Sequence, residues 1–213
     1  MLNWSLREVF RWNRTAFTES GLGIFIATLA ILLAFCVLLV TQQIQIVRIV
    51  PHPSSLLQNF LLLTGMAAVE EAFFRVGLFL GLLRLSGRLW VAIWGQALLF
   101  GLAHAWNPGA TTFTVLNNSL GGLLYALAFV RTKRIWLPLF LHTAWNYSQA
   151  AAGFAISGDP TFSHMLVELV AVGPAAGSGG EYGLEGSWFS LLARGIVLGL
   201  TLWWTQPQSA IID

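Results

Sequence analysis

Long stretches without a charged side chain constrain the fold of this chain more than any other feature. Residues 21–40 contain no Asp, Glu, Lys or Arg, and further apolar stretches recur along the chain. A helix of about 20 apolar residues crosses the hydrocarbon core of a bilayer. Only 9% of all residues are charged, whereas soluble domains carry roughly 25%, so the chain lacks the polar surface of a soluble protein. We therefore predict an integral membrane protein.

The breaks between these stretches predict an all-α fold, a polytopic transmembrane helical bundle of about six spans. The sequence PHPSS at 51–55 interrupts the chain, and Ser54 or Ser55 is suited to cap a long second helix that ends near Leu85. Residues 161–173 are too few to span a bilayer and are expected to form a short interfacial or re-entrant helix. No repeat or linker divides the chain, so residues 1–213 are expected to form a single domain. The six expected spans are residues 21–40, about 55–85, 89–106, 110–130, about 137–156 and 187–204.

Lys and Arg residues are unevenly distributed between the two ends of the expected spans. Arg48 falls on the side opposite the N-terminus, whereas eight others fall on the N-terminal side. Because cytoplasmic loops are enriched in Lys and Arg, both termini are predicted to be cytoplasmic. A net charge of only +2, with no basic cluster, argues against a nucleic-acid partner. The residues on the N-terminal side are Arg7, Arg11, Arg14, Arg84, Arg88, Arg131, Lys133 and Arg134.

Three ionisable residues interrupt the second expected span, in the sequence VEEAFFRVG at 69–77. An ionised group at the centre of a span costs about 3 kcal/mol on insertion scales, so such residues usually have partners or a function. Glu71 and Arg75 are four residues apart with the acid first, which favours an ion pair on one helix face. Glu70 points about 100° away from Glu71 around the helix and has no partner within its own segment.

Polar residues on two other expected spans are candidate partners for Glu70. His104 ends the sequence FGLAH in the third span, and His142 and Asn146 lie four residues apart on one face of the fifth. A carboxylate in a pocket of low dielectric constant is suited to act as a general base, and an imidazole can hold the attacking water. The second histidine and the amide would donate hydrogen bonds to a developing oxyanion.

The same residues are also suited to metal chemistry. Glu70, His104 and His142 would ligate a divalent metal such as zinc, whose bound water would then be the nucleophile. The residue types permit both the metal-dependent and the metal-independent route.

Each of these residues also has a purely structural interpretation. A Glu–Arg pair can serve only to stabilise a bundle, and a histidine or Asn146 can serve only to join helices by hydrogen bonds. At the level of function, the ionisable residues would also suit a proton-coupled transporter subunit, although no paired broken helices indicate one. A catalytically silent scaffold or immunity protein would retain them too. Peptide hydrolysis is the leading hypothesis, because three spans together provide the groups that such a reaction needs.

Three short motifs occur in order on three expected spans. EEAFFR at 70–75 fits EExxxR, FGLAH at 100–104 fits FxxxH, and HTAWN at 142–146 fits HxxxN. Together they resemble the CPBP family of intramembrane proteases, which includes the type II CAAX prenyl endopeptidases and proteins linked to bacteriocin processing or immunity. The resemblance covers residues 68–149, and GGEYGLEGS at 179–187 is similar to the glycine-rich segment before the last helix of some members.

The resemblance implies an endopeptidase in a prokaryotic cell membrane that acts on a membrane-embedded or lipid-modified peptide. The family is described both as metal-dependent and, in its CAAX branch, as metal-independent, so the cofactor stays open. The implied roles are water activation by Glu70 and His104, stabilisation of the tetrahedral intermediate by His142 and Asn146, and support by Glu71 and Arg75.

Two features depart from the family pattern. Many members have Gly directly after the arginine, whereas here Val76 stands between Arg75 and Gly77, which bears on helix packing beside the motif. The chain has six expected spans where CAAX endopeptidases have more, and this puts the prenyl-peptide substrate in question more than the site itself.

Overall fold

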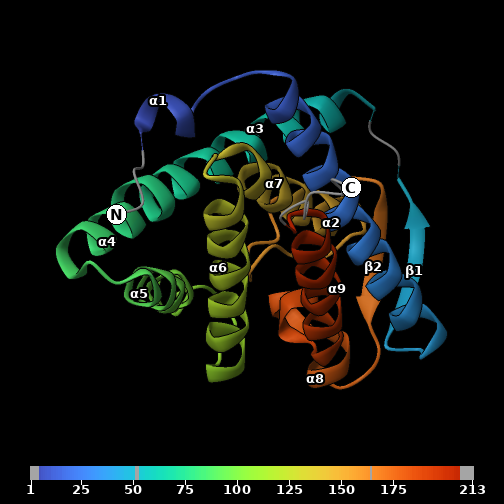
Figure 1. The fold of residues 1–213 in the computed structure, drawn as a ribbon. Helices are drawn as coiled ribbons and strands as arrows, with labels where there is room; N and C mark the ends of the chain where they lie inside the picture. The colour runs from blue at the N-terminus through green and yellow to red at the C-terminus, as the bar shows by residue number, and fades with distance from the viewer. Residues whose placement is uncertain (1–4, 51–52, 164, 207–213) are drawn as a thin grey trace, which may run out of the picture.

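The chain is predominantly helical, as Figure 1 shows for a computed structural model that describes residues 5–50, 53–163 and 165–206. A π-helical segment, η1 (Ala72–Phe79), joins two consecutive helices of the N-terminal half. Two 3₁₀ turns, η2 (Gly180–Tyr182) and η3 (Leu184–Gly186), precede the last helix. The α-helices are α1 (Leu6–Val9), α2 (Arg14–Val40), α3 (Pro53–Glu71), α4 (Leu80–Ser86), α5 (Leu89–Ala103), α6 (Thr112–Thr132), α7 (Trp136–Ala151), α8 (Ala175–Ser178) and α9 (Trp188–Trp204).

Every expected span coincides with a helix, but the number of spans is supported only in part. Within the described ranges, α2 and α6 are long and apolar enough to cross a bilayer by length and composition, while α5 and α9 are apolar but shorter. The second expected span is the continuous helix formed by α3, η1 and α4. The proposed cap at Ser54 or Ser55 lies outside the described side chains, as do His52 and His164, which have no predicted role.

The expectation of an all-α fold is wrong in one region, where the chain forms a small antiparallel sheet. Strand β1 (Ile44–Ile49) pairs with β2 (Val167–Ala171), so the helix expected within 161–173 is a strand instead. Both strands are rich in β-branched residues, which favour extended backbone. Their pairing joins segments about 120 residues apart, and an ion pair at 2.5 Å between Arg48 Nε and Glu168 Oε2 fastens it.

Helix α2 packs closely against α7 and α9, and α5 packs against α6. The main hydrophobic core lies between these helices and includes Ile31, Leu38, Leu137, Leu141 and Val197. Small residues allow the backbones to approach, as is common between membrane helices.

Replacement of Gly23 by leucine is expected to destabilise the contact between α2 and α7. A Cβ atom at Gly23 would lie 2.8 Å from the backbone nitrogen of Leu141, which cannot move without displacing α7. We expect Gly23→Leu to lower the free energy of unfolding by about 1–3 kcal/mol, the usual cost of overpacking. Gly21→Leu is a matched control, because a Cβ there has no neighbour within 4 Å. Unfolding of the detergent-solubilised variants measures the difference, and equal stabilities would contradict the prediction.

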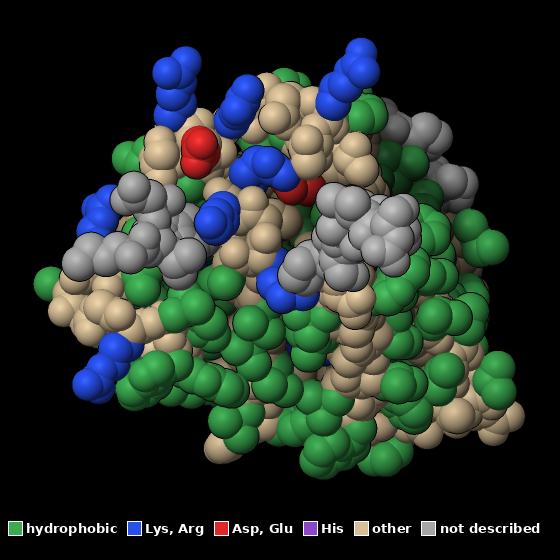
Figure 2. Space-filling model, in the orientation of Figure 1, with side chains coloured by type: hydrophobic (Ala, Val, Ile, Leu, Met, Phe, Trp, Pro, Cys, Tyr) green, Lys and Arg blue, Asp and Glu red, His purple; other side chains and the backbone are tan. Residues whose placement is uncertain are grey.

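The helices that carry the polar residues are inclined to one another. In Figure 1, α6 and α9 run upright side by side, whereas the long helix from α3 to α4 crosses the molecule obliquely. Figure 2 shows Lys and Arg side chains gathered mostly toward the upper end of this view, above a broad hydrophobic surface.

Candidate functional site

The helix that carries both glutamates changes its winding directly after them. Helix α3 ends at Glu71 and continues as the π-helical η1, which returns to α-helix at Leu80. A π-helical turn accommodates an extra residue within a helix and is often found at functional sites. The change of winding lies between Glu71 and Arg75, so their ion pair spans it.

The predicted ion pair between Glu71 and Arg75 is present and fully buried. Arg75 Nε lies 2.9 Å from Glu71 Oε2, and neither side chain has any exposed surface. The guanidinium also lies over the rings of Phe100 and Tyr125, 5.1 and 5.3 Å from their centroids, and donates to the carbonyl of Gly122 at 3.4 Å. A buried charge is tolerated when it is paired and has further polar and cation–π contacts.

Glu71 also holds His142, a contact that the sequence analysis did not foresee. His142 Nδ1 donates a hydrogen bond to Glu71 Oε1 at 2.9 Å, because an ionised carboxylate can only accept. The imidazole stacks on Tyr125 with 4.8 Å between ring centroids and 18° between planes. These two contacts fix the orientation of the ring and leave Nε2 free for the cavity that it lines.

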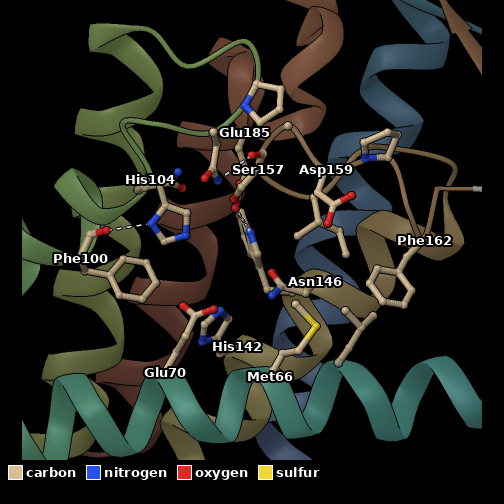
Figure 3. A pocket seen from close by; sticks show the side chains of 18 of the residues that line it. Met66, Glu70, Phe100, His104, His142, Asn146, Ser157, Asp159, Phe162 and Glu185 are labelled. Atoms are coloured by element: carbon tan, nitrogen blue, oxygen red, sulfur yellow. Dashed lines mark hydrogen bonds between the residues drawn. The ribbon is translucent and has the colours of Figure 1, made fainter.

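Glu70 differs from its neighbour in having no such partner. Its Oε2 is buried, and among the described residues it meets no hydrogen-bond partner. Figure 3 shows the carboxylate rising from α3 toward the cavity, close to His142. A buried acceptor without a protein partner is a place where a water molecule or a substrate group is expected to bind.

His104 is the C-cap residue directly after α5 and is oriented by the backbone of that helix. Its Nδ1 donates to the carbonyl oxygen of Phe100 at 2.8 Å, which leaves Nε2 as the nitrogen that can accept a proton. The rings of His104 and His142 both pack against Phe100, with centroid distances of 4.9 and 5.8 Å. The two imidazoles from α5 and α7 therefore flank the same aromatic ring.

All four predicted catalytic residues line one cavity of about 340 Å³. Glu70 comes from α3, His104 from α5, and His142 and Asn146 from α7, as Figure 3 shows. The cavity continues along α3 past Met66 toward Phe162, so one part of its wall is apolar. Its other polar lining residues are Asn107, Asn118, Ser157, Asp159, Glu185 and Arg194.

The conditional metal set of Glu70, His104 and His142 is not assembled as a ligand cluster. Within the described ranges, no group of three or more His, Cys, Asp or Glu side chains is placed to hold a metal ion. The Nδ1 atoms of both histidines are used in hydrogen bonds, which leaves their Nε2 atoms directed to other partners. As placed in the described part of the chain, these three residues do not form a metal centre.

A second buried polar cluster lines the same cavity, and the sequence analysis missed it. The Glu185 carboxylate accepts hydrogen bonds from Trp145 Nε1 at 2.7 Å, from Arg194 Nη2 at 3.1 Å and from Ser157 Oγ. Arg194 Nε also donates to Asn117 Oδ1 at 2.9 Å. Burial alone would raise the pKa of Glu185, but the charge of Arg194 and the hydrogen bonds outweigh it and hold that pKa below its usual value. The carboxylate is therefore ionised at neutral pH.

Two signals in the sequence could have located this cluster. Arg194 is the one charged residue between 187 and 204, so the reasoning that singled out Glu70 applies to it equally. The adjacent amides Asn117 and Asn118 interrupt another apolar span in the same way.

The fold and the site together define a helical protein with Glu70 and two histidines around one cavity. Residues 52–148 match the family model described as type II CAAX prenyl endopeptidase Rce1-like. The matched family is embedded in membranes, and the match confirms the predicted resemblance to CPBP proteases. The match includes Glu70, His104, His142 and Asn146 but ends before Ser157. No curated protein and no solved structure gives a significant match.

Proposed function

We propose that this chain is an intramembrane endopeptidase that hydrolyses a peptide bond of a membrane-embedded or lipid-modified substrate. The observation that carries the proposal is the convergence of Glu70, His104, His142 and Asn146 from three helices on one cavity. The family match over residues 52–148 supports a protease. The apolar wall near Met66 and Phe162 is suited to the hydrophobic residues of such a substrate.

In the proposed mechanism Glu70 and His104 activate one water molecule. The water donates one hydrogen bond to the unpartnered Oε2 of Glu70 and another to Nε2 of His104. As the water oxygen attacks the carbonyl carbon, its proton passes to Glu70, and a tetrahedral intermediate with a negatively charged oxygen forms. The intermediate breaks at the C–N bond, and Glu70 returns the proton to the leaving amine. No other reactant is consumed.

His142 and Asn146 are assigned to the developing oxyanion. The Asn146 amide supplies N–H donors, and His142 supplies one at Nε2 when that nitrogen is protonated. Glu71 supports this role, because it holds Nδ1 at 2.9 Å and would stabilise the positive imidazolium. Donors held rigidly before the reaction stabilise the charge without reorganisation.

The arrangement in the membrane is part of the proposal. We place both termini in the cytoplasm of a prokaryotic cell, with about six membrane-crossing segments formed by α2, α3–α4, α5, α6, α7 and α9. The gathering of Lys and Arg side chains toward one end of the molecule supports this orientation (Figure 2).

Reconstitution of the full chain into vesicles tests the function. Wild-type protein and His104→Gln are incubated with a lipid-anchored peptide, and mass spectrometry identifies new peptide ends. New ends with the wild type, lost with the variant, are the expected result. Proton flux without cleavage, measured in the same vesicles with an enclosed pH dye, would instead identify a transporter. The absence of both activities over a library of apolar peptide sequences would indicate a silent scaffold.

Loss of the Asn146 donor is expected to slow catalysis while substrate binding is retained. Asn146→Asp has nearly the same shape but replaces the N–H donors by an acceptor. Since one oxyanion donor is commonly worth about 10²–10³ in kcat, we expect a fall in kcat of that size with KM changed less than about threefold. Steady-state kinetics on the reconstituted enzyme measures both constants. An unchanged kcat would remove Asn146 from the oxyanion site.

A further inference from the structure

A tight turn at 156–159 forms part of the cavity wall and has an unusual backbone. Ile156 and Asp159 bridge each other through two backbone hydrogen bonds of 2.9 Å. The two residues between them have positive φ, 48° at Ser157 and 87° at Gly158. Glycine adopts this conformation readily, but serine does so only where its surroundings enforce it. The contacts of Ser157 must therefore hold it in this conformation.

Three hydrogen bonds from two other segments hold this turn. Ser157 Oγ donates to the carboxylate of Glu185, and Asn107 Nδ2 donates to the carbonyl oxygen of Ser157 at 2.9 Å. The backbone N–H of Gly158 donates to the carbonyl oxygen of Tyr182 at 3.0 Å. Asn107, Ser157, Gly158 and Glu185 all line the cavity. The turn is thus fastened across the cavity by residues distant in sequence.

Glu185 is the centre of this arrangement because it contacts three elements at once. Its carboxylate joins Ser157 in the turn, Trp145 on α7 and Arg194 on α9. The Arg194 guanidinium also lies 4.5 Å from the centroid of a Trp145 ring. Trp145 is next to Asn146 and one turn from His142 along α7. With three donors already bound, the buried carboxylate has little capacity left to take up a proton or a ligand.

The position of Glu185 differs from that of the catalytic set. Figure 3 shows Glu185 and Ser157 on the other side of the cavity from Glu70. Glu185, Arg194 and Ser157 also lie outside the segment 52–148 that the family model matches. The cavity therefore combines a wall from the matched segment with a second wall built from residues beyond it.

We propose that Glu185 is a positioning residue. Its hydrogen bonds with Ser157 and Trp145 form a clasp that joins the turn 156–159 to α7, so that the substrate peptide is held against Glu70. The inference rests on the proposed function and specifies how that site is closed. When the clasp is lost, the turn moves away from the cavity and the peptide bond is presented to the activated water less accurately. A displacement of about 1 Å can cost about 10²-fold in rate.

Two variants test the clasp by removing it in different ways. Glu185→Ala removes all three hydrogen bonds to the carboxylate, whereas Ser157→Ala removes the bond from the turn to Glu185 and keeps those from Trp145 and Arg194. Ser157→Ala leaves the buried Glu185–Arg194 pair intact, so it tests the turn even where Glu185→Ala folds poorly. The matched controls are Glu181→Ala, at an exposed glutamate in the same glycine-rich segment, and Ser163→Ala, whose hydroxyl donates to the nearby carbonyl of Pro160.

Amide hydrogen exchange of the full-length protein in detergent is the first measurement. We expect exchange at Gly158 and Asp159 to accelerate about tenfold or more in Ser157→Ala, with α5 and α7 unchanged and the unfolding midpoint close to wild type. The same variant should lower kcat/KM about 10- to 100-fold, whereas both controls leave exchange and activity unchanged.

The two measurements separate this inference from the proposed function. Exchange at the turn that is unchanged in both clasp variants would overturn the clasp, whatever the enzyme does. Accelerated exchange with full cleavage activity would also overturn it as a positioning device. If exchange is accelerated in the clasp variants but the wild-type protein cleaves no peptide, both the protease assignment and the positioning role are overturned. The hydrogen bonds that hold the turn would still be supported by the exchange data.

Discussion

Glu70→Gln is expected to abolish peptide cleavage while the protein stays folded. Glutamine has almost the same size as glutamate and can still hold a water molecule, but it cannot take up the proton that the water must lose. General-base catalysis is typically worth about 10²–10⁴ in rate, so we expect kcat to fall by at least about 10³-fold. Stability should change little, because Oε2 of Glu70 has no described protein partner whose hydrogen bond would be lost.

The control for Glu70→Gln is Glu181→Gln, which neutralises an exposed carboxylate outside the cavity. Cleavage of a lipid-anchored peptide in vesicles and the unfolding midpoint in detergent are measured for both variants. Normal cleavage by a correctly folded Glu70→Gln protein would disprove the assignment of the base. A loss of folding in that variant alone would mean that Glu70 has a structural role, although its Oε2 has no partner among the described residues.

The sequence was sufficient to predict that the two neighbouring glutamates have different surroundings. A spacing of four residues placed Arg75 beside Glu71 and not beside Glu70, and the structure contains that ion pair. The same periodicity placed His142 and Asn146 on one face of α7, where both line the cavity. Rules of this kind succeed because helical geometry relates residues three or four apart whatever the tertiary structure is.

Contacts between distant segments could not be predicted in this way. No local pattern relates Glu185 to Ser157 or Arg194 to Asn117, and the pairing of β1 with β2 depends on a partner about 120 residues away. The segment of β2 is apolar and short, and such a run does not distinguish a strand from a helix until its partner is known.

Helix inclination was a further quantity that the sequence left open. At 1.5 Å per residue, His142 lies about 12 Å from Arg134 along its helix, whereas Glu70 lies about 21 Å from Arg84. With upright helices these side chains would stand at different depths. The oblique course of α3–η1–α4 in Figure 1 removes the conflict, because distance along that helix is not depth in the bundle.

The pair Glu71–Arg75 is expected to have the largest effect on stability. Neither side chain is exposed to solvent, so removal of one partner leaves the other as an uncompensated buried charge. Breaking such a pair typically costs about 3–5 kcal/mol. We therefore expect Glu71→Gln to be strongly destabilised and to accumulate poorly in the membrane, with a lowered unfolding midpoint in detergent.

A double variant separates the contribution of this pair to stability from its contribution to catalysis. In Glu71→Leu/Arg75→Met both charges are replaced by apolar side chains of similar length, a change that is often neutral or stabilising for a buried pair. We expect the double variant to recover most of the stability lost in Glu71→Gln. Cleavage should remain reduced at least about tenfold, because His142 Nδ1 no longer has the acceptor that orients it at 2.9 Å. Recovery of full activity would show that Glu71 serves only to neutralise Arg75, whereas stability that is not recovered would show that the charges themselves hold α3–η1 in place.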